Sequence, residues 1–348
     1  MMKKFLLVLT ALMWAAASYA CTTAVISAGA SKTGRPMLWK QRDTDGRYNY
    51  VSYFNDPGTL AFTGVVSTKD KNRKSVWSGV NEKGFAIMNS MSYGLSPVKD
   101  NDRPWEGIIM KKALQICETV DDFENYIKSL PQPNGLEANF GVIDAKGGAA
   151  YFEVHDLGYT RFDVPEGGYL IRSNYSMTGR KGEGKGYERY DRAAEKMSAH
   201  GAPFTAEWIF ANLGRDNLIA RKTTVSCTVI EGVGSGEPAS SSVMWVAPGY
   251  TPACYALPVW VAAGDAIAEP LHSSKGNYSS LNEFALTMLD NGTDVSSQVA
   301  EAEAVEFKVG RTLDERFRKN GIDRDVVLHH SAKAQRRYNH FLKETLLK

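Results

Sequence analysis

The chain has 348 residues, of which 43% are hydrophobic and 23% charged, a composition typical of a globular protein that can bury a large core. Its 41 basic and 39 acidic residues nearly balance, so nothing predicts the basic surface that nucleic-acid binding requires. Four cysteines are too few for a disulfide framework in a chain of this length.

The first twenty residues have the pattern of a secretory signal peptide. Lys3 and Lys4 precede an apolar run over 5–17, and a small-residue site ends at Ala20. That run is shorter than the ~20 residues of a membrane-spanning helix, and no apolar segment of that length follows. We expect a cut after Ala20 and export to the periplasm or the extracellular space. The mature chain over 21–348 should then be neutral and have no stable membrane span.

The predicted cut would make Cys21 the first residue, with a free α-amine beside its thiol. Two other interpretations stay open. Cys21 could be the acylated residue of a lipoprotein, although such signals usually place Leu where Ser18 stands. It could also be a structural or disulfide cysteine.

Strand-like runs rich in Val, Ile, Tyr, Phe and Thr follow along the chain, separated by Gly, Asp or Asn. They come in consecutive sets with helices in separate runs, which argues against a doubly wound parallel sheet. The sequence predicts an α+β fold: an αββα sandwich of two mostly antiparallel sheets flanked by helices, in one domain over 21–348. Strands are expected at 22–29, 35–43, 49–56, 60–67, 75–80, 84–90, 139–156 (with a hairpin turn at 144–148), 159–164, 168–175, 223–232, 241–249 and 256–264, and helices at about 104–130, 187–199, 206–213 and within 295–347.

An N-terminal cysteine can attack an acyl carbon without a histidine partner. Its own α-amine, with an ordinary pKa of ~7.7–8.0, serves as the base near neutral pH. The six histidines show no metal-binding or catalytic spacing, so we expect no metal. A papain-like pairing of Cys117 or Cys227 with His155 is a weaker alternative, because no Gly-rich nucleophile setting surrounds either cysteine.

A nucleotide site is also disfavoured. The segment "GRKGEGK" over 179–185 has phosphate-loop spacing, but Gly186 follows where Ser or Thr is required.

Four further segments follow the Cys-Thr start in order: "GRPMLWKQRDTD", "WSGVNEKGFAIMNS", "NFGVIDAKGGAAYFEV" and "IRSNYS". This order resembles the N-terminal-nucleophile (Ntn) hydrolases of the linear-amide type. These comprise choloylglycine hydrolases, penicillin V acylases and the peptidase C45-like acyltransferases. The resemblance spans roughly 21–192 and continues more loosely to about residue 260.

The resemblance implies a role for individual residues. Cys21 matches the nucleophile, and Asp43 matches the aspartate that contacts its amine. Asn174 matches the asparagine that donates its amide to the oxyanion, with Asn89 as a second donor. Arg189, preferred to Arg192 because an aromatic residue follows it, matches an arginine that braces the site.

Two of these positions also have a plain structural interpretation. Asp43 could cap a loop, and Asn174 could satisfy a backbone carbonyl at a strand end. Lys40 stands where choloylglycine hydrolases have Arg, so we expect it to bind substrate, and differently from those enzymes because a lysine is a point charge.

We therefore expect an exported hydrolase that cleaves a small-molecule linear, non-peptide amide through a thioester, without a metal or organic cofactor. Bile-salt conjugates, penicillin V, N-acyl amino acids and acyl-homoserine lactones would suit this chemistry. An acyltransferase on the same fold and a non-catalytic envelope lipoprotein acylated at Cys21 are the alternatives. The sequence leaves open whether the chain forms a homo-oligomer and whether Cys227 and Cys254 form a disulfide.

Overall fold

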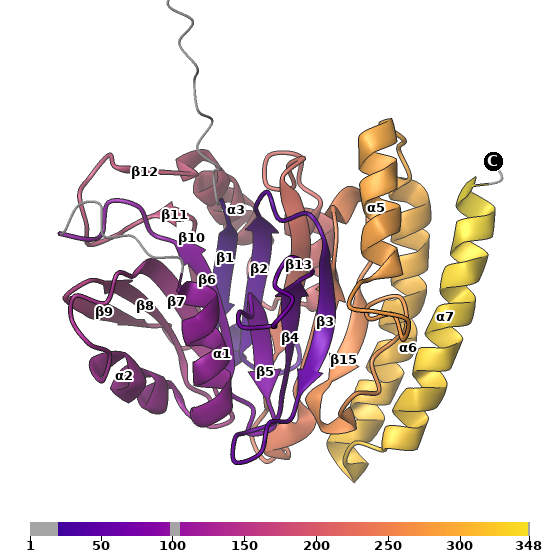
Figure 1. Ribbon diagram of the computed structural model, residues 1–348, viewed down its shortest axis with the longest axis horizontal. Helices are drawn as coiled ribbons and strands as arrows, with labels where there is room; N and C mark the ends of the chain where they lie inside the picture. The colour runs from indigo at the N-terminus through magenta and orange to yellow at the C-terminus, as the bar shows by residue number, and fades with distance from the viewer. Residues whose placement is uncertain (1–19, 98–104, 347–348) are drawn as a thin grey trace, which may run out of the picture.

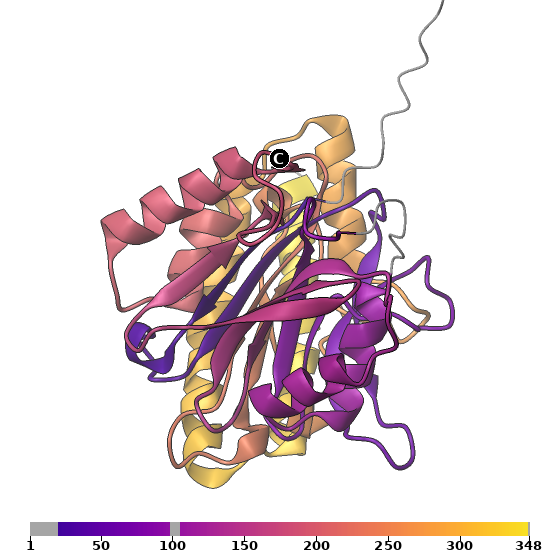
Figure 2. The same cartoon turned by 90° about the vertical axis from the view of Figure 1, so that its left-hand side faces the viewer.

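The computed structural model describes residues 20–97 and 105–346, so the expected signal peptide lies outside the described residues except for Ala20. Two antiparallel sheets lie face to face, and helices cover their outer faces (Figures 1 and 2). The predicted α+β sandwich is therefore confirmed.

The first sheet has the strand order β10-β1-β2-β13-β14-β15. Two of its pairings join distant parts of the chain: Thr23 lies opposite Arg172, and Asp43 lies opposite Thr224. The start of β1 is therefore beside the end of β10, and the end of β2 is beside the start of β13. The strands are β1 (Thr22–Ile26), β2 (Met37–Asp43), β10 (Tyr169–Arg172), β13 (Thr224–Glu231), β14 (Val243–Ala247) and β15 (Leu257–Trp260).

The second sheet is a meander in which strands pair in chain order. Alternate side chains of β6 serve two cores: Ala86 and Met88 pack toward the first sheet, whereas Ile87 packs in the cluster under α1 and α2. The strands are β3 (Asn49–Phe54), β4 (Phe62–Ser67), β5 (Ser78–Asn81), β6 (Ala86–Met91), β7 (Glu137–Ile143), β8 (Ala149–His155) and β9 (Gly158–Asp163), while β11 (Asn174–Tyr175) and β12 (Gly184–Lys185) form a separate ribbon.

Helices α1 (Glu106–Ile116) and α2 (Val120–Lys128) pack on the second sheet. The first sheet is covered by α3 (Tyr187–His200), α4 (Ala206–Ile209) with the π-helix η2 (Phe210–Gly214) that continues it, and α6 (Ser296–Asn320). Helices α5 (Ser280–Asn291) and α7 (Arg324–Leu346) complete this side, and the short turns are η1 (Ala28–Ala30), η3 (Ala239–Ser241), η4 (Thr251–Ala253) and η5 (Val261–Ala263). Within the described part of the chain, no helix combines the length and the apolar character needed to cross a membrane.

The single helix expected over 104–130 is wrong, because the structure has two helices there. The chain leaves the helix at Cys117, and Thr119 starts α2 by accepting a hydrogen bond from the backbone of Asp122. The side chain of Asp122 bonds back to the backbone of Thr119, which completes a capping box. The expected C-terminal helical region is likewise divided, by Gly321, into α6 and α7.

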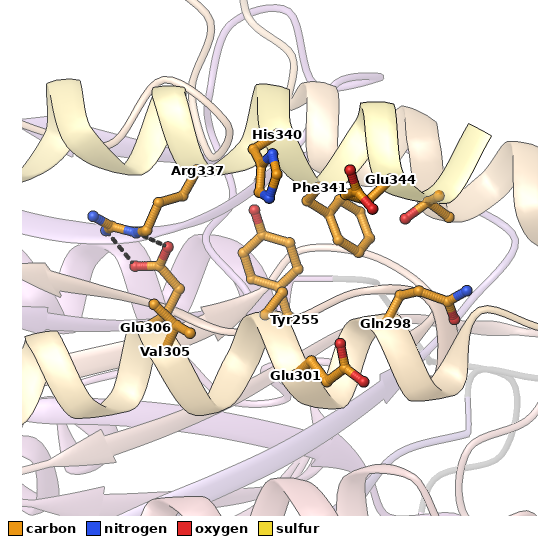
Figure 3. A pocket seen from close by; sticks show the side chains of 11 residues that line it. Tyr255, Gln298, Glu301, Val305, Glu306, Arg337, His340, Phe341 and Glu344 are labelled. Atoms are coloured by element: carbon orange, nitrogen blue, oxygen red, sulfur yellow. Dashed lines mark hydrogen bonds and ion pairs between the residues drawn. The ribbon is translucent and has the colours of Figure 1, made fainter. Parts of the chain in front are cut away.

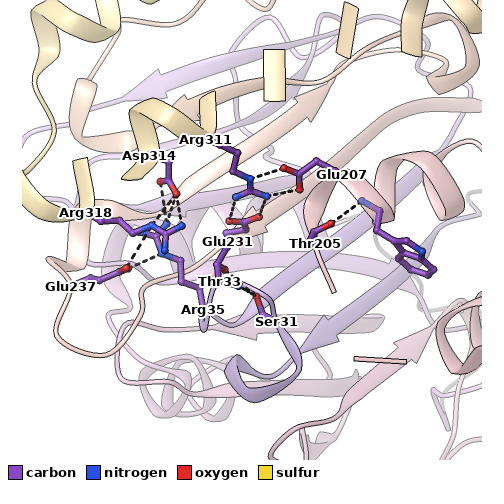
Figure 4. A network of polar contacts seen from close by, with 11 residues as sticks. Ser31, Thr33, Arg35, Thr205, Glu207, Glu231, Glu237, Arg311, Asp314 and Arg318 are labelled. Carbon is purple, nitrogen blue, oxygen red and sulfur yellow. Dashed lines mark hydrogen bonds and ion pairs between the residues drawn. The ribbon is translucent and has the colours of Figure 1, made fainter. Parts of the chain in front are cut away.

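A network of ion pairs fastens α6 to the first sheet (Figure 4). Arg311 of α6 binds Glu231 at the end of β13 through two contacts of 2.6 and 2.7 Å, and binds Glu207 of α4 through two of 2.7 Å. Nearby, the fully buried Arg35 contacts Asp314 of α6 at 3.2 Å. The network thus joins the helical layer to the ends of the central strands.

Candidate active site

Cys21 lies immediately before β1 and is 7% exposed. Its backbone nitrogen donates a hydrogen bond of 2.7 Å to Oδ1 of Asn174. Asn174 follows β10, and the pairing of β10 with β1 is what brings these two residues together across 153 positions. The sequence-predicted nucleophile and the predicted asparagine therefore meet at one end of the first sheet.

Arg189 completes this contact from the first turn of α3. Its guanidinium donates to the carbonyl of Cys21 at 2.5 Å, to Oγ1 of Thr22 at 2.8 Å and to Oδ1 of Asn174 at 2.8 Å. Gly186 stands before α3 at a φ of +80°, and a Cβ there would lie 2.0 Å from Nη2 of Arg189. Glycine at this position thus gives the arginine its room.

Arg192, the other arginine considered from the sequence, is not part of this contact. Its guanidinium pairs with Glu195 at 3.0 Å and Asp216 at 3.4 Å, and its side chain is 35% exposed. Of the two, Arg189 is the one that the structure places at Cys21.

Asn174 lies at Cys21 in an orientation that differs from the expectation. Its Oδ1 accepts from Cys21 and Arg189, so its NH2 points the other way and donates to the carbonyl of Met91 at 3.1 Å. In this geometry, the Asn174 amide that was expected to bind the oxyanion is already hydrogen-bonded to Cys21, Arg189 and Met91.

Asp43, at the end of β2, is also beside the start of β1. Its backbone carbonyl accepts a hydrogen bond of 3.3 Å from the nitrogen of Ala20. Its carboxylate accepts from Arg221 at 2.7 and 3.0 Å and from Oγ1 of Thr224 at 2.6 Å. Burial raises the pKa of the Asp43 carboxyl, while Arg221 and Thr224 oppose that shift.

The nitrogen of Cys21 is a peptide amide while Ala20 precedes it, and its one hydrogen is taken by Asn174. The expected contact between the Asp43 carboxylate and a free α-amine can form only in a chain that begins at Cys21. Sequence reasoning missed Arg221, which precedes β13 and reaches Asp43 across 178 positions. Its only signal was a basic residue before a predicted strand.

Lys40 of β2 is 2% exposed and therefore covered by protein. Its ammonium donates to Oδ1 of Asn89 at 2.6 Å and to the carbonyl of Trp77 at 2.7 Å. Burial lowers the pKa of Lys40 to about 7, Cys21 raises it and Arg42 lowers it.

The remaining cysteines are buried free thiols in the structure. Burial raises the pKa of Cys117 to about 12 and raises that of Cys227 and Cys254 well above the ordinary value. Such thiols are not activated for attack. His155 stands at the end of β8, where its Nδ1 accepts from the backbone of Leu157.

A cavity of about 340 Å³ lies elsewhere, between α6 and α7 (Figure 3). Tyr255 forms part of its lining, and an ion pair of Arg337 with Glu306 at 2.6 Å borders it. None of the predicted site residues lines this cavity. Over 20–97 and 105–346, His, Cys, Asp and Glu nowhere form a group of three that could hold a metal ion.

No family model matches the sequence, and no curated protein matches it. Among solved structures, the chain is similar to the ortholog of N-acylethanolamine-hydrolyzing acid amidase from Caenorhabditis elegans, with 14% identity, a TM-score of 0.47 and coverage of 60% of this chain and 92% of that one. It is similar to a variant of conjugated bile acid hydrolase from Clostridium perfringens, with 11% identity, a TM-score of 0.47 and coverage of 70% and 93%. It is also similar to penicillin V acylase from Agrobacterium tumefaciens, with 10% identity, a TM-score of 0.42 and coverage of 70% and 86%. Identities and TM-scores at this level leave the chemistry to be derived from the residues of this chain.

Proposed function

We propose that the mature chain is an amide hydrolase that uses Cys21 as an N-terminal nucleophile. The observation that carries the proposal is the convergence on Cys21 of Asn174 and Arg189, with four hydrogen bonds of 2.5 to 2.8 Å to one another and to Cys21 and Thr22. Asn174 and Arg189 are almost fully buried, so Asn174 holds the nitrogen of Cys21 and Arg189 its carbonyl oxygen in a fixed position.

Removal of the leader after Ala20 would convert that nitrogen into an α-amine. Ala20 is 1% exposed and Cys21 is 7% exposed. A peptidase cannot reach a buried peptide bond, so the cut belongs before this segment folds, as export across a membrane would allow. After the cut, the amine keeps Oδ1 of Asn174 as an acceptor and gains hydrogens that the carbonyl or carboxylate of Asp43 can accept.

The chemistry follows from a thiol and an amine on the same residue. The α-amine takes the thiol proton, and the sulfur attacks the amide carbon while the carbonyl electron pair moves to oxygen. The resulting oxyanion collapses, the carbon–nitrogen bond breaks, and the α-ammonium returns the proton to the leaving amine. Water, deprotonated by the same amine, then cleaves the thioester, releasing the acid and restoring the thiol.

The proposed substrates are linear, non-peptide amides of the bile-salt, penicillin V or N-acyl amino acid type. Their hydrolysis by protein that begins at Cys21 can be followed by release of the amine, with an amine acceptor added in parallel. A new amide in place of the acid would identify an acyltransferase. We expect acid as the product.

The substitution Cys21→Ser should lower this hydrolysis by about 10³-fold or more, because an alkoxide is much harder to form than a thiolate. Cys117→Ala is the matched control and should keep the activity. It removes a buried thiol from the hydrophobic cluster under α1 and α2. Full hydrolysis by a correctly cut Cys21→Ser protein would exclude the proposed nucleophile.

A further inference from the structure

The segment that carries Asn174 is anchored to the second sheet as well as to the first. The carbonyl of Ser173 accepts a hydrogen bond from Oγ of Ser90 at 2.7 Å and from the side-chain amide of Asn139 at 3.3 Å. On the other side, Oδ1 of Asn174 accepts from the nitrogen of Cys21 at 2.7 Å. The position of Asn174 at Cys21 therefore depends on contacts that come from the second sheet.

Glu153 of β8 anchors the chain beyond Asn174. This residue is fully buried, and its carboxylate accepts from the backbone nitrogens of Met177 at 2.7 Å and Thr178 at 3.0 Å, and from Oγ1 of Thr178 at 2.7 Å. The carboxylate also forms an ion pair of 3.5 Å with Arg172, the last residue of β10. Asn174 thus lies between two segments that contact the same carboxylate.

The strand register explains why these side chains point toward the first sheet. Ser90 lies opposite Asn139, which in turn lies opposite Glu153, so the three share one face of the second sheet. Tyr151, two residues before Glu153, is on the same face and donates to Oγ1 of Thr23 on β1 at 2.9 Å. The row therefore faces the first sheet, near the start of β1.

The contacts of Glu153 leave it no role in proton transfer. Oε1 accepts from Met177, and Oε2 accepts from the nitrogen and the hydroxyl of Thr178, so donors occupy both oxygens. Hydrogen bonds to a charged acceptor are roughly twice as strong as those between neutral groups. Because two of the donors are backbone groups, these bonds fix the course of the chain after Asn174.

We propose that Glu153 is a positioning residue, which keeps Oδ1 of Asn174 at the nitrogen of Cys21 by anchoring the chain at Met177 and Thr178. This inference deepens the proposed function and rests on it. In protein that begins at Cys21, that nitrogen is the amine that takes the thiol proton, and Asn174 orients it by accepting one of its hydrogens. Glu153 touches neither the substrate nor Cys21 in this scheme.

Two reactions of Cys21 test the inference on protein that begins at this residue. Acylation by p-nitrophenyl butyrate gives a burst of p-nitrophenolate, whose amplitude counts the competent molecules and whose rate constant reports the attack. Alkylation by iodoacetamide, located by peptide mapping, needs only the thiolate. Alkylation requires no hydrolysis, so failure of the amidase assay and failure of this inference are distinguishable.

Glu153→Gln should lower both rate constants by at least about tenfold, since misplacing a reacting group by about 1 Å can cost about 10²-fold. The NH2 of Gln cannot accept a hydrogen bond, so one of the two backbone amides loses its partner. The burst amplitude and the half-saturating ester concentration should match those of the parent chain. Loss of a negative charge by itself would favour the thiolate and speed up alkylation, so the sign of the change separates positioning from a charge effect.

Two further variants locate the effect. Glu153→Asp keeps the charge beside Arg172, but it is one methylene shorter and cannot reach both backbone amides, so it should slow both reactions as well. It tests the inference even if Glu153→Gln does not fold. Asn174→Ala removes the acceptor at Cys21, and adding Glu153→Gln to it should cause no further loss, because Glu153 acts through Asn174.

Asp144→Asn is the matched control. Asp144 is also a buried carboxylate that accepts from backbone nitrogens, those of Val120 and Lys146 at 2.8 Å and of Gly148 at 2.9 Å. It follows the end of β7 beside α2, whereas the strand pairs that reach the candidate site are at the start of β7. This variant should change neither reaction.

Normal acylation and alkylation by folded Glu153→Gln or Glu153→Asp would overturn the inference. So would faster alkylation in Glu153→Gln, or a further loss when Glu153→Gln is added to Asn174→Ala. An equal slowing in Asp144→Asn would show that the loss of any buried carboxylate has this effect, and it would overturn the inference as well.

Discussion

Two charged residues at the site, Lys40 and Asp43, are buried. The charged form of each is therefore stabilised by protein groups instead of water. Asp43 has a guanidinium and a hydroxyl to stabilise its charge. Among the described residues, the hydrogen-bond acceptors of Lys40 are the neutral oxygens of Asn89 and Trp77, so burial dominates and its pKa falls to about 7. The charged groups that influence this pKa are Cys21 and Glu106, which raise it, and Arg42, which lowers it.

The shifted pKa of Lys40 predicts how stability changes with pH. Its ordinary value is 10.5 and its value in the folded chain is about 7, so between these values the unfolded chain binds more protons. Stability therefore rises with pH through this window, and the full cost of the buried charge applies below about pH 7.

Lys40→Met removes that dependence. At pH 7 the variant should have a larger free energy of unfolding than the parent chain. This difference should shrink by roughly 2 kcal/mol between pH 7 and pH 9, as measured by urea unfolding. Lys319→Met, at an exposed position on α6, is the control and should leave the two curves parallel, because its ammonium lies in water before and after unfolding. Parallel curves for Lys40→Met would mean that Lys40 is not buried as a titrating group.

Cys21, Asn174 and Arg189 could be placed together from the sequence because the order of short motifs carries that information. The direction of each amide could not be predicted, because it depends on neighbours such as Met91 and Lys40 that only the folded chain supplies. Lys40 itself was expected to bind substrate, whereas its ammonium contacts Asn89 and Trp77.

At the scale of elements, ion pairs attach α6 to the sandwich. Arg311 meets two carboxylates, and Glu231 among them is fully buried. Removing the cation would leave that carboxylate buried without a partner, which is much more costly than removing an exposed pair.

Arg311→Met should therefore lower the free energy of unfolding by about 3–5 kcal/mol, measured by denaturant titration. Arg324→Met is the comparison, since Arg324 pairs with Asp265 where both side chains are more than half exposed, and it should cost less than about 1 kcal/mol. Adding Glu231→Gln to Arg311→Met should recover part of the loss. Equal effects of the two arginine variants would show that the buried pair has no special weight.

The elements were predicted unevenly, for reasons that the structure makes clear. Strand runs were recognised because β-branched and aromatic residues are dense there, as in β13 and β14. The division between α1 and α2 was missed because Thr119 and Asp122 form a capping box inside a sequence that otherwise keeps helical periodicity. Helix α5 was not predicted at all.

At the scale of the whole molecule, the candidate site exists only because the two-sheet sandwich brings distant segments to one end. Cys21 and Asp43 come from the N-terminal strands, Asn174 and Arg189 from the middle of the chain, and Arg221 from the start of β13. The αββα layering could be predicted from the order of strands and helices. The contact between Arg221 and Asp43 could not, because it depends on the pairing of β2 with β13, which no local pattern specifies.

The same view explains why the residue before Cys21 matters. Ala20 extends the line of β1 and bonds to Asp43, so a chain that keeps it has a peptide nitrogen where the mechanism needs an amine. The thiol would be present in both forms, but only the form that begins at Cys21 would have a base beside it.

The most direct measurement compares these two forms by intact mass after mixing with p-nitrophenyl butyrate. One protein begins at Cys21 and the other at Ala20, and peptide mapping locates the acyl group in each. The account predicts rapid addition of one butyryl group to Cys21 in the first form, followed by its loss to water, and little acylation of the second. Equal acylation of both forms, or an acyl group on another residue, would contradict the claim that Cys21 is an N-terminal nucleophile.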